Sequence, residues 1–249
     1  LTDFESESGG FFDFTDQPLY SGNTWEHGPL FGGSTPSSCA SGEECWGTGL
    51  YDTDYTDDNS DTQGKNAFKQ SLLSPVLDVD PVGVKDPSVY FDSFHQLMTL
   101  SSGAVNPTYR YVDCAYVEVR SSSTSTFGDE PFTHIEIDIQ NSSLSFNSGY
   151  RQVGYVNENN KIDGRCNGVD RNDFALGGTS ITSNNPGGWE SIKIDLTDYV
   201  GQYVQLRFVM EYNNVQPPIS FSVDNNTMPG WYIDNFRFGG KLAQSGSMT

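Results

Sequence analysis

The chain has 249 residues, with 13 Lys and Arg against 33 Asp and Glu, so its formal net charge at pH 7 is −20. A surface this acidic repels phosphate backbones and anionic membranes, so nucleic acid is not an expected partner. No run approaches the roughly 18 apolar residues that a membrane-spanning helix needs, and membrane insertion is not expected either. An acidic surface attracts cations instead, which favours a divalent metal as a ligand.

Seven segments have the composition of β-strands, with apolar and polar residues in alternation or many β-branched and aromatic side chains. In chain order they are residues 88–97, 111–120, 132–139, 152–156, 189–195, 203–212 and 230–238. Clusters of Gly, Asn, Pro and Ser separate them, and only residues 196–201 favour a short helical turn. The sequence therefore predicts an all-β protein built as an antiparallel sandwich.

The chain is expected to form one domain over residues 1–238, followed by a flexible tail or linker at residues 239–249. The tail is rich in Gly and Ser and poor in apolar residues. Because the chain begins with Leu1 rather than Met, we expect that a signal peptide has been removed or that this is an excised fragment.

Four cysteines, which allow three pairings, point to an oxidising compartment. Cys39 and Cys45 bracket a short turn-rich segment that a disulfide closes easily. Cys114, in a strand-like run, and Cys166, in a polar loop, then form the natural second bridge. The alternative is four independent buried thiols; no Cys or His spacing typical of zinc occurs.

Eight segments follow one another in a familiar order: residues 25–29, 45–52, 71–78, 89–95, 112–119, 188–190, 194–196 and 229–236. This series, which spans Phe4 to Phe238, resembles the MAM-like domains found beside the catalytic domain of immune inhibitor A type metallopeptidases, in other secreted bacterial proteases and in surface adhesins. The resemblance implies an all-β fold, a two-sheet antiparallel jelly-roll β-sandwich with long loops. Two features depart from the family pattern: the polar insertion at residues 149–185 and the Cys39/Cys45 pair.

The resemblance also implies a structural cation where the first and last strands meet. Glu5 and Asp234 are the matching carboxylates, and Asp113, at the start of its strand, is a third ligand. Oxygen-only ligation suits Ca²⁺, and Asp234 interrupts an otherwise apolar run, so its carboxylate needs a partner. The alternative is that these acids cap turns or pair with Arg110 and Arg237.

A second metal hypothesis concerns the acidic segment at residues 51–61. Asp52, Asp54 and Asp57 alternate with other residues there and can turn several oxygens toward one Ca²⁺. The segment is not an EF-hand, because it lacks the motif's Gly and its closing Glu. An ordinary solvated acidic loop is the alternative.

No catalytic motif is present. The three histidines, His27, His95 and His134, form no H-E-x-x-H, and G-x-S-x-G is missing. His95 is interpreted as a structural residue. Asn141 and Asn225 begin glycosylation sequons, which matter only in a glycosylating host.

Aromatic residues in loop-like surroundings are candidates for stacking on sugar rings, although most aromatics of a sandwich belong to its core. These candidates are Trp25, Trp46, Tyr51, Tyr55 and Tyr109.

The leading hypothesis is a non-catalytic, secreted or cell-surface module that binds a protein, a glycan or a sibling domain and is stabilised by calcium. The first alternative is a self-associating subunit of an extracellular filament or surface assembly. The second alternative is a jelly-roll hydrolase or lyase, which would need a pocket of converging acids.

Overall fold

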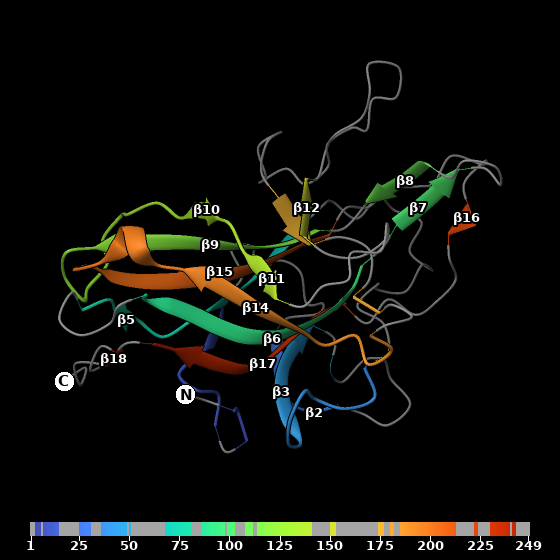
Figure 1. Cartoon of the computed structure of the whole chain (residues 1–249), viewed down its shortest axis with the longest axis horizontal. Coiled ribbons are helices and arrows are strands. Elements are labelled where there is room, and N and C mark those ends of the chain that lie inside the picture. The colour runs from blue at the N-terminus through green and yellow to red at the C-terminus, as the bar shows by residue number, and fades with distance from the viewer. Residues whose placement is uncertain are drawn as a thin grey trace.

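The computed structural model describes most of the sandwich strands and several of their connections (Figure 1). The described residues are 3–5, 7–14, 25–30, 36–48, 50, 68–80, 86–97, 99–102, 108–111, 114–140, 150–152, 174–176, 180–181, 185–212, 222–223, 230–239 and 241–242.

Two antiparallel sheets lie face to face, and a small third sheet lies at one end (Figure 1). Sheet 1 has the order β1 (Phe12–Phe14), β4 (Phe68–Leu73), β15 (Tyr203–Tyr212), β9 (Cys114–Ser122), β13 (Phe174–Leu176), β12 (Tyr150–Gln152). Three short strands also join sheet 1: β5 (Leu77–Asp78), β10 (Thr133–Ile135) and β18 (Lys241–Leu242). Sheet 2 has the order β11 (Asp138–Gln140), β14 (Glu190–Asp195), β6 (Ser88–Gln96), β17 (Gly230–Phe238), β3 (Glu44–Thr48), β2 (Trp25–Pro29). Sheet 3 consists of β16 (Ser222–Val223), β7 (Thr99–Ser102) and β8 (Thr108–Tyr111).

The connections between the two large sheets have jelly-roll topology. The eight main strands in chain order are β3, β4, β6, β9, β13, β14, β15 and β17. Counted one to eight, they have the spatial order 1-8-3-6 in sheet 2 and 2-7-4-5 in sheet 1. This is the pattern of two nested Greek keys, so the predicted jelly-roll β-sandwich is confirmed.

The strand predictions are most accurate where apolar and polar residues alternate. β15 and β17 have the predicted bounds, and β6 and β14 differ from them by one residue. The predicted strand at residues 132–139 is wrong: β10 pairs with β9 of sheet 1, whereas β11 pairs with β14 of sheet 2. The predicted strand at residues 111–120 is also corrected, because β8 ends at Tyr111 and β9 begins at Cys114.

The core lies between the sheets and follows the period of two along each strand. In β15, the fully buried Val204, Leu206, Phe208 and Met210 point inward. The Phe208 ring meets that of Phe91 from sheet 2 edge to face, with 5.2 Å between ring centroids. This contact is one of the apolar contacts that join the two sheets across the core.

Residues 123–135 cover part of the outer face of sheet 1. The Arg207 guanidinium forms an ion pair with Glu118 and lies 4.2 Å from the centroid of the Phe132 ring. Arg120 lies 4.8 Å from the same ring and 4.4 Å from that of Phe127. Two guanidinium groups are therefore held under one loop by aromatic faces and one carboxylate.

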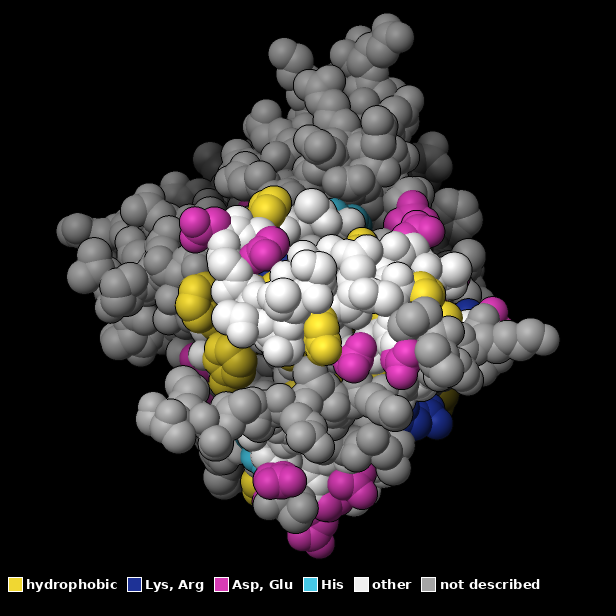
Figure 2. Space-filling model, turned by 90° about the vertical axis from the view of Figure 1, so that its left-hand side faces the viewer, with side chains coloured by type: hydrophobic (Ala, Val, Ile, Leu, Met, Phe, Trp, Pro, Cys, Tyr) yellow, Lys and Arg dark blue, Asp and Glu magenta, His cyan; other side chains and the backbone are white. Residues whose placement is uncertain are grey.

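Figure 2 shows the end of the sandwich at which β9 ends. Uncharged polar side chains and backbone fill the centre of this face, and acidic side chains surround it.

Regular structure continues past residue 238, because Lys241 and Leu242 pair with β5. The domain boundary predicted at residue 238 stays a prediction. In the described part of the chain, no helix is long and apolar enough to span a bilayer.

Candidate cation site

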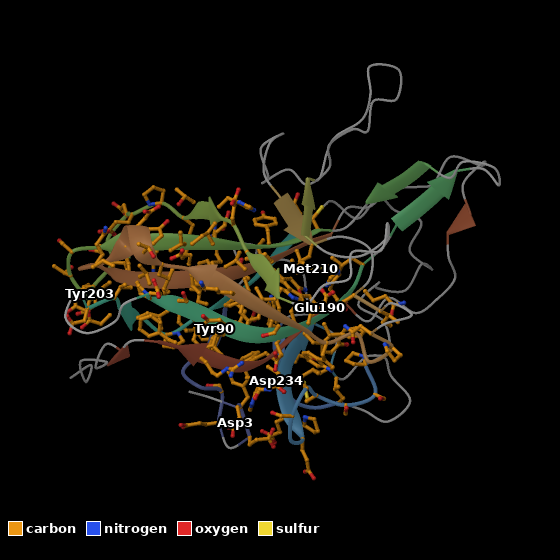
Figure 3. All side chains as sticks on the ribbon, viewed as in Figure 1. Asp3, Tyr90, Glu190, Tyr203, Met210 and Asp234 are labelled. Carbon is orange, nitrogen blue, oxygen red and sulfur yellow. A yellow bond between two sulfur atoms is a disulfide. The ribbon has the colours of Figure 1, made fainter. Side chains whose placement is uncertain are left out.

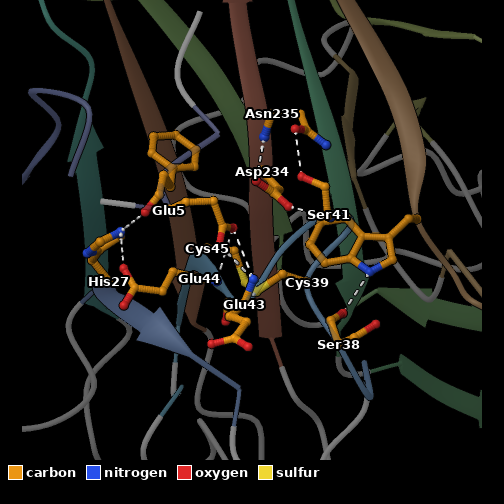
Figure 4. Close-up of a disulfide and its surroundings, with 12 residues drawn as sticks. Glu5, His27, Ser38, Cys39, Ser41, Glu43, Glu44, Cys45, Asp234 and Asn235 are labelled. Carbon is orange, nitrogen blue, oxygen red and sulfur yellow. Dashed lines mark hydrogen bonds and ion pairs between the residues drawn. A yellow bond between two sulfur atoms is a disulfide. The ribbon is translucent and has the colours of Figure 1, made fainter. Parts of the chain in front are cut away.

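The candidate cation site lies on the outer face of sheet 2, where a disulfide-closed loop covers the middle of β17 (Figure 4). Cys39 and Cys45 close this loop with a disulfide whose Cα atoms are 5.8 Å apart. Residues 3–5 of the N-terminal segment lie beside it. We call residues 39–45 the disulfide loop.

Glu5 holds the disulfide loop through its main chain. Its carboxylate accepts the backbone N–H of Glu43 at 2.8 Å and 3.1 Å, one distance to each oxygen, and the N–H of Glu44 at 3.3 Å. Gly42 has φ +58°, a left-handed conformation that suits glycine and turns the following N–H groups toward Glu5. Successive N–H groups in this arrangement form an anion-binding nest.

Asp234 anchors the same loop from β17 and is fully buried. Its Oδ2 accepts the N–H of Ser41 at 2.9 Å, and its Oδ1 accepts the N–H of Asn235 at 2.6 Å. Burial raises the pKa of Asp234 to about 6; these two hydrogen bonds oppose the rise, and the charges of Asp92 and Glu5 add to it. The two neighbouring carboxylates thus disfavour the ionisation of Asp234.

Asn235 joins the disulfide loop to β6. It has φ 51° and lies in the irregular register between Asp234 and Arg237. Its side-chain Oδ1 accepts the Ser41 hydroxyl at 2.9 Å, and its Nδ2 donates to Asp92 Oδ2 at 2.8 Å. Asn tolerates the left-handed conformation better than most residues, which explains this residue type at the bulge.

The N-terminal segment is fixed by a second contact. His27 Nε2 lies 2.9 Å from the Phe4 carbonyl oxygen and 3.6 Å from Glu44 Oε2. Because both oxygens are acceptors, His27 Nε2 carries the proton and donates. Phe4 itself is buried in the core, with φ 63°. These contacts hold Glu5, which follows Phe4, against the loop.

The structure brings Glu5 and Asp234 to the same loop, and both carboxylates accept main-chain N–H groups. This contact agrees with the alternative in which the acids cap a turn, while the calcium role stays a prediction. Asp113, Asp52, Asp54 and Asp57 lie outside the described residues. Within the described part, no three His, Cys, Asp or Glu side chains group as a metal site.

The donor chemistry nevertheless suits an oxygen-ligated cation. Each carboxylate oxygen has two lone pairs, and Asp234 uses one on each oxygen for its two N–H donors. Asp234 is buried beside two further carboxylates, a setting in which a cation lowers the electrostatic cost. Ca²⁺ accepts such carboxylate and main-chain oxygens.

The predicted Cys39–Cys45 disulfide is confirmed. Cys114 is disulfide-bonded as well, at the start of β9. Its predicted partner, Cys166, lies outside the described residues.

The prediction that Trp25 and Trp46 lie in loops and stack on sugars is wrong. They belong to β2 and β3, with 2% and 6% of their surface exposed. The Trp25 ring lies 5.4 Å from that of Trp231, and the Trp46 ring 5.4 Å from that of His27. Short strands containing Gly and Pro lack the alternation that would have revealed them. Tyr51 and Tyr55 lie outside the described residues, as does the side chain of Tyr109 in β8.

Trp189 is a surface residue that the sequence did not single out. Of the four tryptophans in the chain, it alone is partly exposed. Its indole Nε1 donates to the Ser38 carbonyl at 3.1 Å, and its ring lies 6.0 Å from that of Phe94. The preceding Gly187 and Gly188 are the sequence signal for a loop at this point.

No family model matches the chain, and no curated protein matches it. Among solved structures, the K1 cleaved adhesin domain of Lys-gingipain from Porphyromonas gingivalis W83 is similar at 14% identity and a TM-score of 0.27. The match covers 86% of this chain and 97% of that domain. Membership of the MAM-like family therefore stays a prediction.

Proposed function

We propose that this chain is a non-catalytic extracellular binding or accessory module in which the candidate cation site holds a structural calcium ion. Disulfide bonds at Cys39–Cys45 and at Cys114 support an oxidising compartment, because such bonds persist in secreted and cell-surface proteins. The partner is a protein or glycan at a cell surface, or a sibling domain.

The observation that carries the proposal is the burial of Asp234 beside Glu5 and Asp92. A buried carboxylate flanked by like charges is costly to ionise unless a cation compensates it. Glu5 and Asp234 would hold the ion, with main-chain oxygens and Asp113 completing its ligands. Calcium supplies positive charge at this point and no reaction chemistry.

The ion would stiffen a binding surface. Ser41, Glu43 and Glu44 already attach the disulfide loop to Asp234 and Glu5 through N–H groups. Neutralising both carboxylates removes their mutual repulsion, so the loop stays fixed to both the N-terminal segment and β17. A preformed loop loses less conformational entropy when it binds a partner.

The test is thermal unfolding and calorimetric titration with Ca²⁺ after treatment with a chelator. Calcium should raise the melting temperature of the wild type by several degrees, as binding to the folded state requires. Asp234→Asn and Glu5→Gln should abolish this shift, and Asp129→Asn, which changes an exposed carboxylate, should preserve it. A wild-type melt that calcium leaves unchanged removes calcium from the proposal.

A second candidate function is self-assembly, which the exposed aromatic rings on β1 favour. Phe12 and Phe14 are 48% and 41% exposed, and they point to the same side of the last described strand of sheet 1. A second copy could add a strand at this edge. Sedimentation should then show concentration-dependent association that Phe12→Lys with Phe14→Lys abolishes. Val200→Lys, at a large hydrophobic residue that is exposed elsewhere in the described part of the chain, should leave it intact. A monomer at all concentrations excludes this candidate.

A further inference from the structure

Glu190 is an acidic residue on the inner face of sheet 2. It is the first residue of β14, and it shares a face with Ile192 and Ile194, which are fully buried in the core. It pairs across the ladder with Ser93 of β6. Figure 3 shows Glu190 toward the opposite end of the sandwich from Tyr203. The inward-facing residues of β14 are thus one carboxylic acid followed by two isoleucines.

One oxygen of the Glu190 carboxyl lacks the hydrogen bond that normally accompanies burial. The residue is 8% exposed, and its Oε2 is buried with no hydrogen-bond partner. The Trp231 indole N–H, a donor on the same inner face, goes to Ser93 Oγ at 2.9 Å. Nearly all buried polar atoms in proteins have a partner, and an ionised carboxylate without one carries the largest cost.

Among the described residues, the surroundings of Glu190 offer little compensation for a negative charge. On β6, the inward-facing titratable neighbour is the buried His95, two residues beyond Ser93. On β14, the inward-facing residues after Glu190 are Ile192 and Ile194. Across the interior, the described inward residues near this end of β15 are Phe208 and Met210. Burial alone accounts for the raised pKa of the Glu190 carboxyl.

We propose that Glu190 is a proton-controlled latch on the β14 edge of sheet 2. In its neutral acid form it is tolerated between the sheets and keeps β14 paired with β6. When the proton leaves, the charge must reach water, and the start of β14 opens together with the neighbouring β11.

The pH range of the latch follows from the direction of the shift. Burial raises the pKa of Glu190 to about 7, above the ordinary 4.5 that applies to the unfolded chain. The folded state therefore binds the proton more tightly than the unfolded state. The free energy of unfolding falls as the pH rises from the pKa of the unfolded chain through that of the folded protein. At still higher pH Glu190 is ionised in the folded and the unfolded state alike, and no further stability is lost.

The experiment compares the wild type with Glu190→Gln at matched calcium. From about pH 6 to about pH 8.5 the wild type should lose several degrees of melting temperature that Glu190→Gln retains. Glu136→Gln, which alters an exposed carboxyl beside β11, should behave as the wild type. The infrared difference spectrum of the wild type minus Glu190→Gln at about pH 6 should also contain the carbonyl stretch of a protonated carboxyl group.

Hydrogen exchange separates a latch from general destabilisation. After correction for intrinsic rates, amides of β14 should open more readily at the higher pH in the wild type, whereas those of β15 should change little. Equal pH profiles of the wild type and Glu190→Gln would overturn the proposal. Faster exchange spread evenly over both sheets would overturn it as well. Should Glu190→Gln fold poorly, Glu190→Met provides the same comparison without a charge.

Discussion

Gly42 lies directly against the carboxylate of Glu5: a Cβ on Gly42 would stand 2.0 Å from both Cδ and Oε1 of Glu5. Glycine at this position therefore serves two purposes. It permits φ +58°, and it lets the carboxylate approach the N–H groups of Glu43 and Glu44. The Glu5 carboxylate can hold this position against the disulfide loop only because residue 42 has no side chain.

Gly42→Ala should destabilise the protein by about 2 to 4 kcal/mol, since it adds both backbone strain and a clash. Urea unfolding measures the loss. Gly201→Ala provides the strain alone, because Gly201 has φ +83° with no atom within 4 Å of an added Cβ. Gly187→Ala, with open space and no positive φ, should be nearly neutral.

Removing Glu5 tests the clash directly. In a Glu5→Ala background, Gly42→Ala should cost only about as much as Gly201→Ala, because the carboxylate is gone. If Gly42→Ala costs the same in both backgrounds, the proximity of Gly42 to Glu5 does not explain its effect.

Replacing Cys39 and Cys45 by Ser should reduce the free energy of unfolding by about 2 to 3 kcal/mol. The disulfide closes a short loop, with a sequence separation of 6, and the open loop also presents its N–H groups less well to Asp234 and Glu5. Chemical unfolding of the double variant measures the change. A double variant as stable as the wild type would show that hydrogen bonds alone hold the loop.

Phe132→Leu should destabilise the cover of sheet 1 by about 1 to 2 kcal/mol, because it removes the aromatic face shared by Arg120 and Arg207 while keeping an apolar side chain. Phe127→Leu is the matched variant, since Phe127 meets Arg120 alone. Equilibrium unfolding should therefore rank Phe132→Leu as the more destabilising of the two. The opposite order would assign the stability of this loop to burial rather than to the guanidinium contacts.

The sequence predicted the sandwich well where a long strand directs alternate residues into the core. β15 turns every second residue from Val204 to Met210 into the core, and β17 does so at Trp231 and Ile233 before its bulge; both strands have the predicted bounds. The same reasoning was wrong for residues 132–139. It predicted one strand there, but the segment divides between β10 and β11, which belong to different sheets. Periodicity describes local geometry and holds no information on which sheet a residue joins.

The contacts of the candidate cation site could not be predicted from local sequence patterns either. The resemblance named Glu5 and Asp234, but no pattern showed that their partners would be N–H groups of Ser41, Glu43 and Glu44. Those contacts join residues 38 to 193 positions apart and depend on how the loop closes. Trp25 and Trp46 were misplaced because β2 and β3 are short and interrupted by glycine.

Trp189 offers an optical test of this arrangement. Trp25, Trp46 and Trp231 have 2%, 6% and 0% of their surface exposed, so acrylamide should quench mainly Trp189 in the native protein. Trp189→Phe should remove most of the quenchable fluorescence with little loss of stability, since a phenyl ring can still pack on Phe94 and water can replace the exposed hydrogen bond to Ser38. Trp46→Phe, at a buried position, should leave the quenchable part intact and destabilise the fold instead, because it also removes the hydrogen bond from Trp46 Nε1 to the Ser8 carbonyl. Strong quenching that persists in Trp189→Phe would contradict the burial of the other three indoles and, with it, the packing of β2 and β3 against the core.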